Sequence, residues 1–318
     1  MGHFHFMGSL MNELLPQLTQ QLVNGLSLGA IYALIAIGYT MVYGIIGMIN
    51  FAHGEIYMIA SYVGLVTLTA IGVQSGYPLP LLLGGALIVS VLVTGLYGWT
   101  VERVAYRPLR GGPRLVPLIS AIGMSIFLQN YVQIGQGARD MSVPVLISGA
   151  LEFQMGSDFT VTVPYSRMVI VGVTLVLMVA LTLFIARSRM GRACRACAED
   201  MGMANLLGID TNKVISFTFV LGAMLAAVGG VLIALTIGKL NPYIGFIAGI
   251  KAFTAAVLGG IGSVTGAMVG GVLIGLIESL GGHFFATRWA DVIIFSILVL
   301  VLVFVPSGLF GRAPATRA

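Results

Sequence analysis

Eight apolar runs, most of them close to twenty residues long, constrain the fold of this chain more than any other feature of its sequence. A helix needs about twenty predominantly apolar residues to cross the hydrocarbon core of a bilayer. We therefore predict a chain that crosses a membrane repeatedly. The predicted spans are 22–43, 55–71, 79–99, 115–134, 168–186, 214–237, 264–280 and 292–305, with 244–258 as a shorter or re-entrant candidate.

Charged residues are scarce, as this interpretation requires. They make up 8% of the 318 residues, whereas soluble domains carry about 25%. The 43 glycines are about twice the usual share, which is typical of membrane helices that approach one another closely. The composition predicts an all-α polytopic membrane protein with about eight transmembrane helices and some broken or re-entrant segments. It excludes a soluble enzyme, a disordered chain and a disulfide scaffold.

The basic residues set the orientation, because cytoplasmic loops carry an excess of Lys and Arg. Eleven of the sixteen fall in three segments, which we place in the cytoplasm. The net charge of +5 follows from this bias and does not indicate binding of nucleic acid. The three segments contain Arg103, Arg107, Arg110 and Arg114, then Arg187, Arg189, Arg192, Arg195 and Lys213, and finally Arg312 and Arg317.

The chain then divides into an N-terminal extension (1–10), one transmembrane domain (11–311) and a cytoplasmic tail (312–318). The connection 135–166 lies outside, and its alternation of apolar and polar residues at 159–163 predicts a strand or hairpin. A tail inside the cell needs an odd number of crossings after 214–237. Either 244–258 crosses as well or a span is broken, as is typical where a membrane protein lines a path. The side of the N-terminus stays open.

A polar segment, residues 50–55, interrupts two apolar runs. A charge that faces lipid at the centre of a span costs about 2.5–3.5 kcal/mol. Asn50, His53 and Glu55 must therefore face the protein interior, a cavity or the interface. One interpretation is a half-helix that begins inside the membrane and lines a translocation path, with Gly54 permitting the turn. The other is a helix-capping cluster at the membrane surface.

The glycine-rich stretch 259–266 is not a nucleotide site. It lacks the Gly-Lys-Ser/Thr ending of a phosphate loop and the third glycine of a dinucleotide fingerprint. Close helix packing is one interpretation, because glycines recur every four residues. A re-entrant loop is the other, and it would bring Gly260, Gly262 and Ser263 to the path. The repeating glycines are Gly262, Gly266 and Gly270, and then Gly271 and Gly275.

No metal site or catalytic residue is predicted. Cys194 and Cys197 have no two further ligands nearby to complete a zinc site, and we expect two unpaired thiols on one helix face. No nucleophile and base can be paired from the few histidines. Among the other ionisable residues near spans, Lys251 and Glu278 are candidates for the path, with snorkelling to the interface as the alternative.

The cytoplasmic connection 187–213 is long, because helix–helix connections usually take about 2–8 residues. Its Ala- and Leu-rich middle is followed by Gly208. We predict a short amphipathic helix with a glycine stop. A simple loop with basic anchors is one interpretation, and a docking surface for a soluble partner is the other.

Several long motifs resemble permeases of bacterial branched-chain amino acid ABC transporters, specifically the LivH type. The resemblance extends over about 11–311 and does not include the first ten residues. The segments that carry it are 32–55 (YALIAIGYTMVYGIIGMINFAHGE), 102–108 (ERVAYRP), 120–123 (SAIG), 191–200 (GRACRACAED) and 255–263 (AAVLGGIGS).

The resemblance implies an importer permease fold in a bacterial inner membrane. Its implied partners are a second homologous permease, two cytoplasmic ATPase subunits and a periplasmic amino-acid-binding protein. The chain itself would bind no cofactor, and ATP and Mg would be used by the ATPases. The family's contact with the ATPase is a coupling helix, which maps onto Ala198, Glu199, Asp200, Gly208, Ile209 and Asp210.

The predicted function is therefore import of leucine, isoleucine or valine by alternating access, with ATP hydrolysis by partner subunits. The chain would not be an enzyme. The alternative is a self-contained channel or an ion-coupled secondary transporter for small amino acids. That alternative needs acids inside the membrane, for which Glu55 and Glu278 are the candidates.

Overall fold

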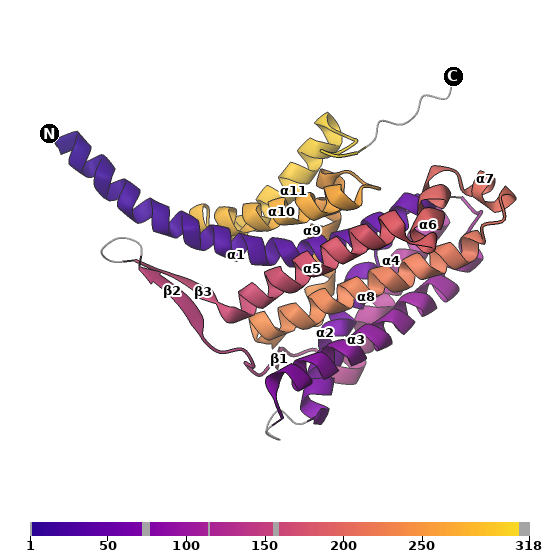
Figure 1. The fold of residues 1–318 in the computed structure, drawn as a ribbon, viewed down its shortest axis with the longest axis horizontal. Helices are drawn as coiled ribbons and strands as arrows, with labels where there is room; N and C mark the ends of the chain where they lie inside the picture. Colours follow the sequence, from indigo (N-terminus) through magenta and orange to yellow (C-terminus); the bar gives the residue numbers. More distant parts are fainter. Residues whose placement is uncertain (1, 72–76, 114, 155–158, 312–318) are drawn as a thin grey trace.

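The computed structural model describes residues 2–71, 77–113, 115–154 and 159–311, with side chains from residue 14 onwards. Within this part of the chain, eight helices are long and apolar enough to cross a membrane, so all eight predicted spans are confirmed. They form one elongated bundle (Figure 1). The eight are α1 (Gly2–Ile46), α2 (His53–Ile71), α3 (Leu79–Val101), α4 (Leu115–Gln136), α5 (Tyr165–Arg187), α8 (Thr211–Ile237), α10 (Val264–Phe284) and α11 (Thr287–Phe304).

The shorter apolar segment also forms a helix, α9 (Ile244–Gly259). It follows strand β4 (Lys239–Leu240), which pairs with β1 (Met141–Ser142) of the outside connection. At its other end, the amide of Phe310 donates to the carbonyl of Gly259 at 2.9 Å. Strand β4 and helix α9 together therefore run from the side of the connection 135–166 to the side of the C-terminal segment, which gives the odd number of crossings that the tail requires.

The transmembrane part of α1 begins on the same side as the connection 135–166, so the orientation predicted from the basic residues places that end of α1 outside. The side chain of Gln20 forms two hydrogen bonds, of 2.8 and 3.0 Å, with the backbone of Thr162. Thr162 lies in β3 (Thr160–Pro164), which pairs with β2 (Ala150–Gln154) and confirms the predicted hairpin. The hairpin and the N-terminal end of α1 share one end of the molecule (Figure 1).

The elements predicted to be cytoplasmic lie at the opposite end of the molecule from the hairpin (Figure 1). Helix α3 continues into a π-helical turn, η1 (Glu102–Tyr106), and a 3-10 turn, η2 (Arg107–Leu109). The connection 187–213 forms two short helices, α6 (Arg189–Glu199) and α7 (Met201–Leu206), and it then turns at Gly208, whose φ is +84°. The predicted helix is thus two helices. Arg114, Arg312 and Arg317 lie outside the described residues.

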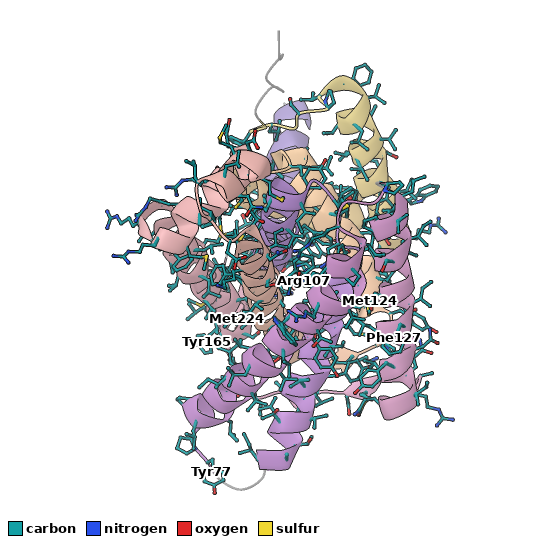
Figure 2. The ribbon with its side chains drawn as sticks, turned by 90° about the vertical axis from the view of Figure 1, so that its right-hand side faces the viewer. Tyr77, Arg107, Met124, Phe127, Tyr165 and Met224 are labelled. Atoms are coloured by element: carbon teal, nitrogen blue, oxygen red, sulfur yellow. The ribbon has the colours of Figure 1, made fainter. Side chains whose placement is uncertain are left out.

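Burial divides the helices into a core and a rim. The apolar windows of α1, α2 and α8 are 83%, 67% and 67% buried, whereas those of α4, α5 and α11 are 28%, 17% and 11% buried. Phe127 of α4, for example, points away from the bundle (Figure 2). The rim helices therefore present their apolar faces to lipid or to another subunit.

The repeated glycines pack helices closely, as predicted. A Cβ atom on Gly271 or Gly275 of α10 would collide with the backbone of α1, and one on Gly266 or Gly270 would collide with the backbone of α9. Gly262 has a different role. Its φ of +94° places it in the turn before α10, where a side chain would be strained.

Both cysteines are unpaired and buried on one face of α6, as predicted. Burial raises the pKa of the Cys194 thiol and of the Cys197 thiol above the usual value. The thiols therefore stay protonated and react slowly with alkylating reagents.

Candidate functional site

The polar segment 50–55 lies inside the protein. Asn50, His53 and Glu55 are each 2% exposed or less. The Asn50 side chain accepts a hydrogen bond from the Tyr106 hydroxyl at 2.9 Å and makes no capping bond to α2. The His53 ring packs edge-on against Tyr39. The burial of these three residues favours the protein interior over a capping cluster at a surface, although Glu55 does lie in the first turn of α2.

Helix α2 begins near the middle of the bundle. The His53 ring lies against Gly38 of α1 and Gly222 of α8, and Gly222 is far from either end of its helix. Helix α2 therefore begins inside the bundle, which agrees with the half-helix interpretation, and its place on a translocation path stays a prediction. The non-helical backbone at 47–52 precedes this helix. Inside a membrane, non-helical backbone is tolerated where protein or a cavity surrounds it.

The start of α9 lies directly against the start of α2. Gly54 packs on Gly245 and Gly249, and a Cβ atom on Gly54 would collide with the carbonyl oxygen of Gly245. A Cβ on Gly245 would in turn approach Glu55 Oε2 to 2.6 Å. The small residues at this contact bring the N-terminal ends of two helices together.

A cavity of about 370 Å³ opens beside this contact, between α1, α2, α4 and α9. Its size lies within the usual range for small-molecule sites, about 300–1,000 Å³. The walls are mainly apolar, and Glu55 is the only ionisable carboxyl group among the lining residues. They are Tyr39, Phe51, Glu55, Ile122, Ser125, Ile126, Gln129, Tyr243, Gly245, Phe246, Gly249, Ile250 and Phe253.

Lys251 and Glu278 lie together but away from this cavity. The ammonium nitrogen of Lys251 contacts Glu278 Oε1 and Asp291 Oδ1, each at 2.8 Å. The Tyr32 hydroxyl donates to Glu278 Oε2, also at 2.8 Å. Lys251 is two residues from Gly249, about 200° around α9, so it faces away from the cavity wall. This cluster joins α1, α9, α10 and α11.

The glycine-rich turn also lies apart from the cavity. Gly260 has a φ of +107° and packs against the backbone of Gly311. Ser263 is the N-cap of α10, where its hydroxyl accepts a hydrogen bond from the amide of Gly266 at 3.1 Å. The structure therefore brings α9, and not this turn, to the start of α2.

The cytoplasmic segment offers an exposed surface with both charged and apolar residues. Asp200 caps α7 and Asp210 caps α8 by accepting hydrogen bonds from backbone amides at 2.9 and 3.1 Å. The bonds to Lys213 lower the pKa of Asp210. Ala198, Glu199 and Gly208 are exposed, and Ile209 is half-buried. Three apolar side chains are also exposed: Met203 at 55%, Leu206 at 83% and Leu207 at 75%.

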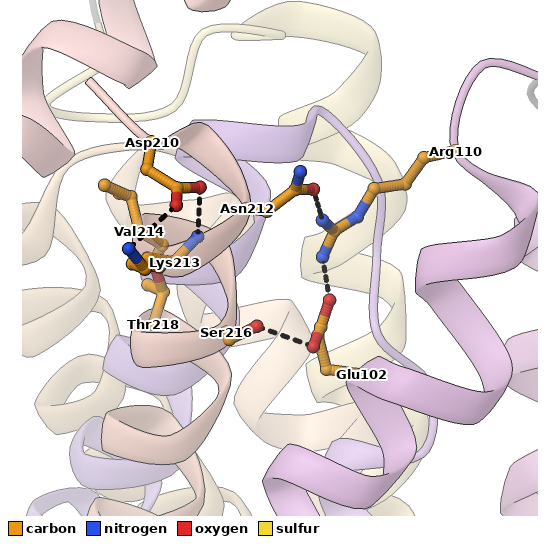
Figure 3. Close-up of polar contacts among 8 residues, drawn as sticks. All are labelled: Glu102, Arg110, Asp210, Asn212, Lys213, Val214, Ser216 and Thr218. Carbon is orange, nitrogen blue, oxygen red and sulfur yellow. Dashed lines mark hydrogen bonds and ion pairs between the residues drawn. The ribbon is translucent and has the colours of Figure 1, made fainter. Parts of the chain in front are cut away.

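A polar network joins the base of this surface to α3 (Figure 3). Glu102 is fully buried, forms an ion pair with Arg110 and accepts a hydrogen bond from Ser216 of α8 at 2.7 Å. Arg110 also donates to Asn212 at 2.9 Å. Burial lowers the pKa of Arg110, although Glu102 opposes that shift. The network fixes the start of α8 relative to the cytoplasmic end of α3.

Sequence reasoning did not select the α4 wall of the cavity or this network as functional. Ser125 and Gln129 are single polar residues in an apolar run, and that was the signal available. Gly245 and Gly249 recur at a four-residue spacing that is typical of close packing, but the sequence analysis did not select them. Glu102 is an acid at the end of an apolar run, among arginines.

Comparison with known proteins identifies the family. A family model described as a branched-chain amino acid transport system permease component matches residues 21–302. The chain belongs to this permease family. It is 57% identical over 293 residues to the high-affinity branched-chain amino acid transport system permease protein BraD of Pseudomonas aeruginosa, which covers 92% of this chain and 95% of BraD.

Two further relatives place the chain within this permease family. It is 53% identical over 305 residues to the permease protein LivH of Escherichia coli K12, with 95% of this chain and 98% of LivH covered. It is 27% identical over 307 residues to the permease protein LivM of Salmonella typhimurium, with 90% and 68% covered. The chain is thus a multi-pass membrane permease of the LivH type, with a more distant likeness to LivM.

Proposed function

We propose that this chain is the permease subunit of an ATP-driven importer for leucine, isoleucine and valine in a bacterial inner membrane. The observation that carries the proposal is identity of 53–57% over nearly the full length of permeases of high-affinity branched-chain amino acid transport systems. The apolar cavity at the meeting point of α2 and α9 supports it, because it suits a small solute with an apolar side chain.

The permease works with partners. It pairs with a second, homologous permease, for which the likeness to LivM is the support. A periplasmic binding protein delivers the amino acid to the outer side. Two cytoplasmic ATPase subunits use ATP and Mg, and this chain binds no cofactor itself. The glycine-rich segment 259–266 supports this division of roles, because it lacks the residues of a nucleotide loop.

The ATPases dock on the cytoplasmic segment. Ala198, Glu199 and Asp200 lie at the end of α6, and Gly208, Ile209 and Asp210 lie between α7 and α8. The exposed Leu206 and Leu207 suit a partner, because apolar side chains in water gain free energy when they are covered. Motion of this segment on ATP binding is passed to α3 and α8 through the Glu102 network, and the spans rock to open the path on alternate sides.

Leucine uptake into proteoliposomes tests the proposal. The chain is reconstituted alone, then with the second permease, the two ATPases and the binding protein, each with and without ATP. We expect uptake only from the complete set with ATP. Uptake by the chain alone under an ion gradient would show that it is a secondary transporter.

Charge reversal tests the docking surface. Glu199→Lys changes an exposed residue at the end of α6, so the fold is expected to survive. We expect it to weaken binding of the ATPase and to reduce ATP-driven uptake, measured by co-purification and by uptake. Glu152→Lys in the outside hairpin is the matched control and is expected to leave both unchanged.

A further inference from the structure

The cavity is lined by a buried carboxylate, one oxygen of which has no partner among the described residues. Glu55 is 1% exposed, and its Oε1 accepts a hydrogen bond from Ser125 at 3.2 Å. Its Oε2 is buried and has no hydrogen-bond partner within the part of the chain that the structure describes. Buried polar atoms are nearly always paired, so an unpaired carboxylate oxygen beside a cavity indicates a partner from outside the chain.

The surroundings of Glu55 indicate what that partner is. Within the described residues, no ion pair includes Glu55, so no cationic side chain offsets its charge, and only the N-terminal ends of α2 and α9 favour it. No group of three His, Cys, Asp or Glu gathers there either, so the set of ligands that a metal ion needs is lacking in the same part of the chain. A single carboxylate in an apolar cavity suits an organic ammonium group, which donates hydrogen bonds and carries one positive charge.

The walls suit the rest of an amino acid. The side of the cavity formed by α4 and α9 is apolar, with Ile122, Ile126, Phe246 and Ile250. The first turn of α9, at Gly245 and Phe246, also lines the cavity, and the N-terminal end of a helix attracts negative charge. An ammonium group at Glu55 therefore has an anion-favouring helix end beside it and apolar surface around it.

We propose that Glu55 binds the ammonium group of the amino acid in transit, with the carboxylate toward the start of α9 and the side chain between α4 and α9. The cavity opens to the surface, because Ile126 and Phe246 are more than half exposed. The site is therefore an open binding position along the translocation path and not a closed pocket. This inference rests on the proposed function, because it assigns a position on the same path.

Uptake by the complete assembly is the first test, with Glu55→Gln as the variant. Gln keeps the size of the side chain and an oxygen for Ser125, and it removes the charge. Loss of a charge-assisted hydrogen bond lowers affinity about ten- to a hundredfold, so we expect leucine uptake at low concentration to fall by about tenfold or more. Glu152→Gln is the matched control and is expected to leave uptake unchanged, because Glu152 is an exposed acid of the hairpin that does not line the cavity.

Protection from labelling is the second test, and it needs no transport. Gln129→Cys places a thiol at the cavity, and Asn130→Cys places one on the adjacent residue, which does not line it. Both are made in a Cys194→Ser, Cys197→Ser background in the complete assembly. We expect millimolar leucine to slow maleimide labelling at position 129 and not at 130. 4-Methylpentanoate, which is leucine without the amine, should not protect, and Glu55→Gln should remove protection by leucine.

The outcomes separate the two proposals. If the unmodified assembly takes up leucine and Glu55→Gln transports and protects equally well, the role of Glu55 is wrong while the proposed function stands. Equal protection by 4-methylpentanoate would also overturn the role of Glu55, because that compound has no ammonium group. If the unmodified assembly with ATP takes up no leucine, the proposed function itself fails.

Discussion

Single residues inside the membrane show how the chain accommodates charge. Lys251 compensates Glu278 and Asp291 together, whereas Glu55 lacks such a partner within the described chain. The sequence presents all of these as ionisable residues in or near apolar runs. Their partners lie on other helices. Only the packed structure therefore distinguishes the carboxylates that form ion pairs from the carboxylate of Glu55, which forms none in the described chain.

Lys251→Met tests the structural role of that cluster. Removing the cation leaves two carboxylates facing each other, and breaking a buried ion pair in this way costs about 3–5 kcal/mol. Asp291→Asn is the matched comparison. Because Asp291 is half exposed and Lys251 keeps Glu278, we expect a loss of at most about 1 kcal/mol. Thermal unfolding of the purified protein in detergent measures both, and equal effects would contradict this account.

At the scale of elements, the apolar runs predicted the spans because hydrophobic length is a local property. The hairpin and the helical cytoplasmic segment were predictable for the same reason, since alternation and a glycine stop are local signals. The meeting of α2 and α9 was not predictable. It depends on the contact of Gly54 with Gly245, nearly two hundred residues apart in the chain, and no local signal specifies such a contact.

Close packing between α1 and α10 gives a prediction at this scale. Gly271→Leu places a side chain where even a Cβ atom would collide with Ala33 of α1. We expect the helices to separate, with a loss of about 1–3 kcal/mol or more and little folded protein. Gly172→Leu in α5 is the control, because a Cβ there meets no atom within 4 Å. Size-exclusion profiles of fluorescent fusions would show the difference, and similar profiles would refute the packing argument.

With the basic segments in the cytoplasm, as predicted, α1 begins outside and the C-terminal segment lies inside; the described chain has nine membrane segments when α9 is counted. The basic segments in the sequence predicted which side of the protein faces the cytoplasm. The side on which α1 begins could be assigned only from the contact of Gln20 with Thr162, which joins the first span to the outside hairpin. In this predicted orientation, the proposed docking surface and the hairpin lie on opposite sides of the membrane.

Labelling from each side tests this topology. In a Cys194→Ser, Cys197→Ser background, Ser148→Cys lies in the outside connection and Leu206→Cys lies in α7. We expect a membrane-impermeant maleimide to label position 148 in intact cells with a permeable outer membrane. Position 206 should react only after the inner membrane is opened. Labelling of position 206 in intact cells would show that the topology is the reverse of the predicted one.

We infer that this permease moves leucine at the expense of ATP hydrolysed by partner subunits. The most direct measurement is the steady-state ratio of leucine inside to outside proteoliposomes that hold the complete assembly, before and after ionophores collapse all ion gradients. We predict accumulation that requires ATP and persists after the ionophores are added. Accumulation that disappears with the ion gradients while ATP remains would contradict the account.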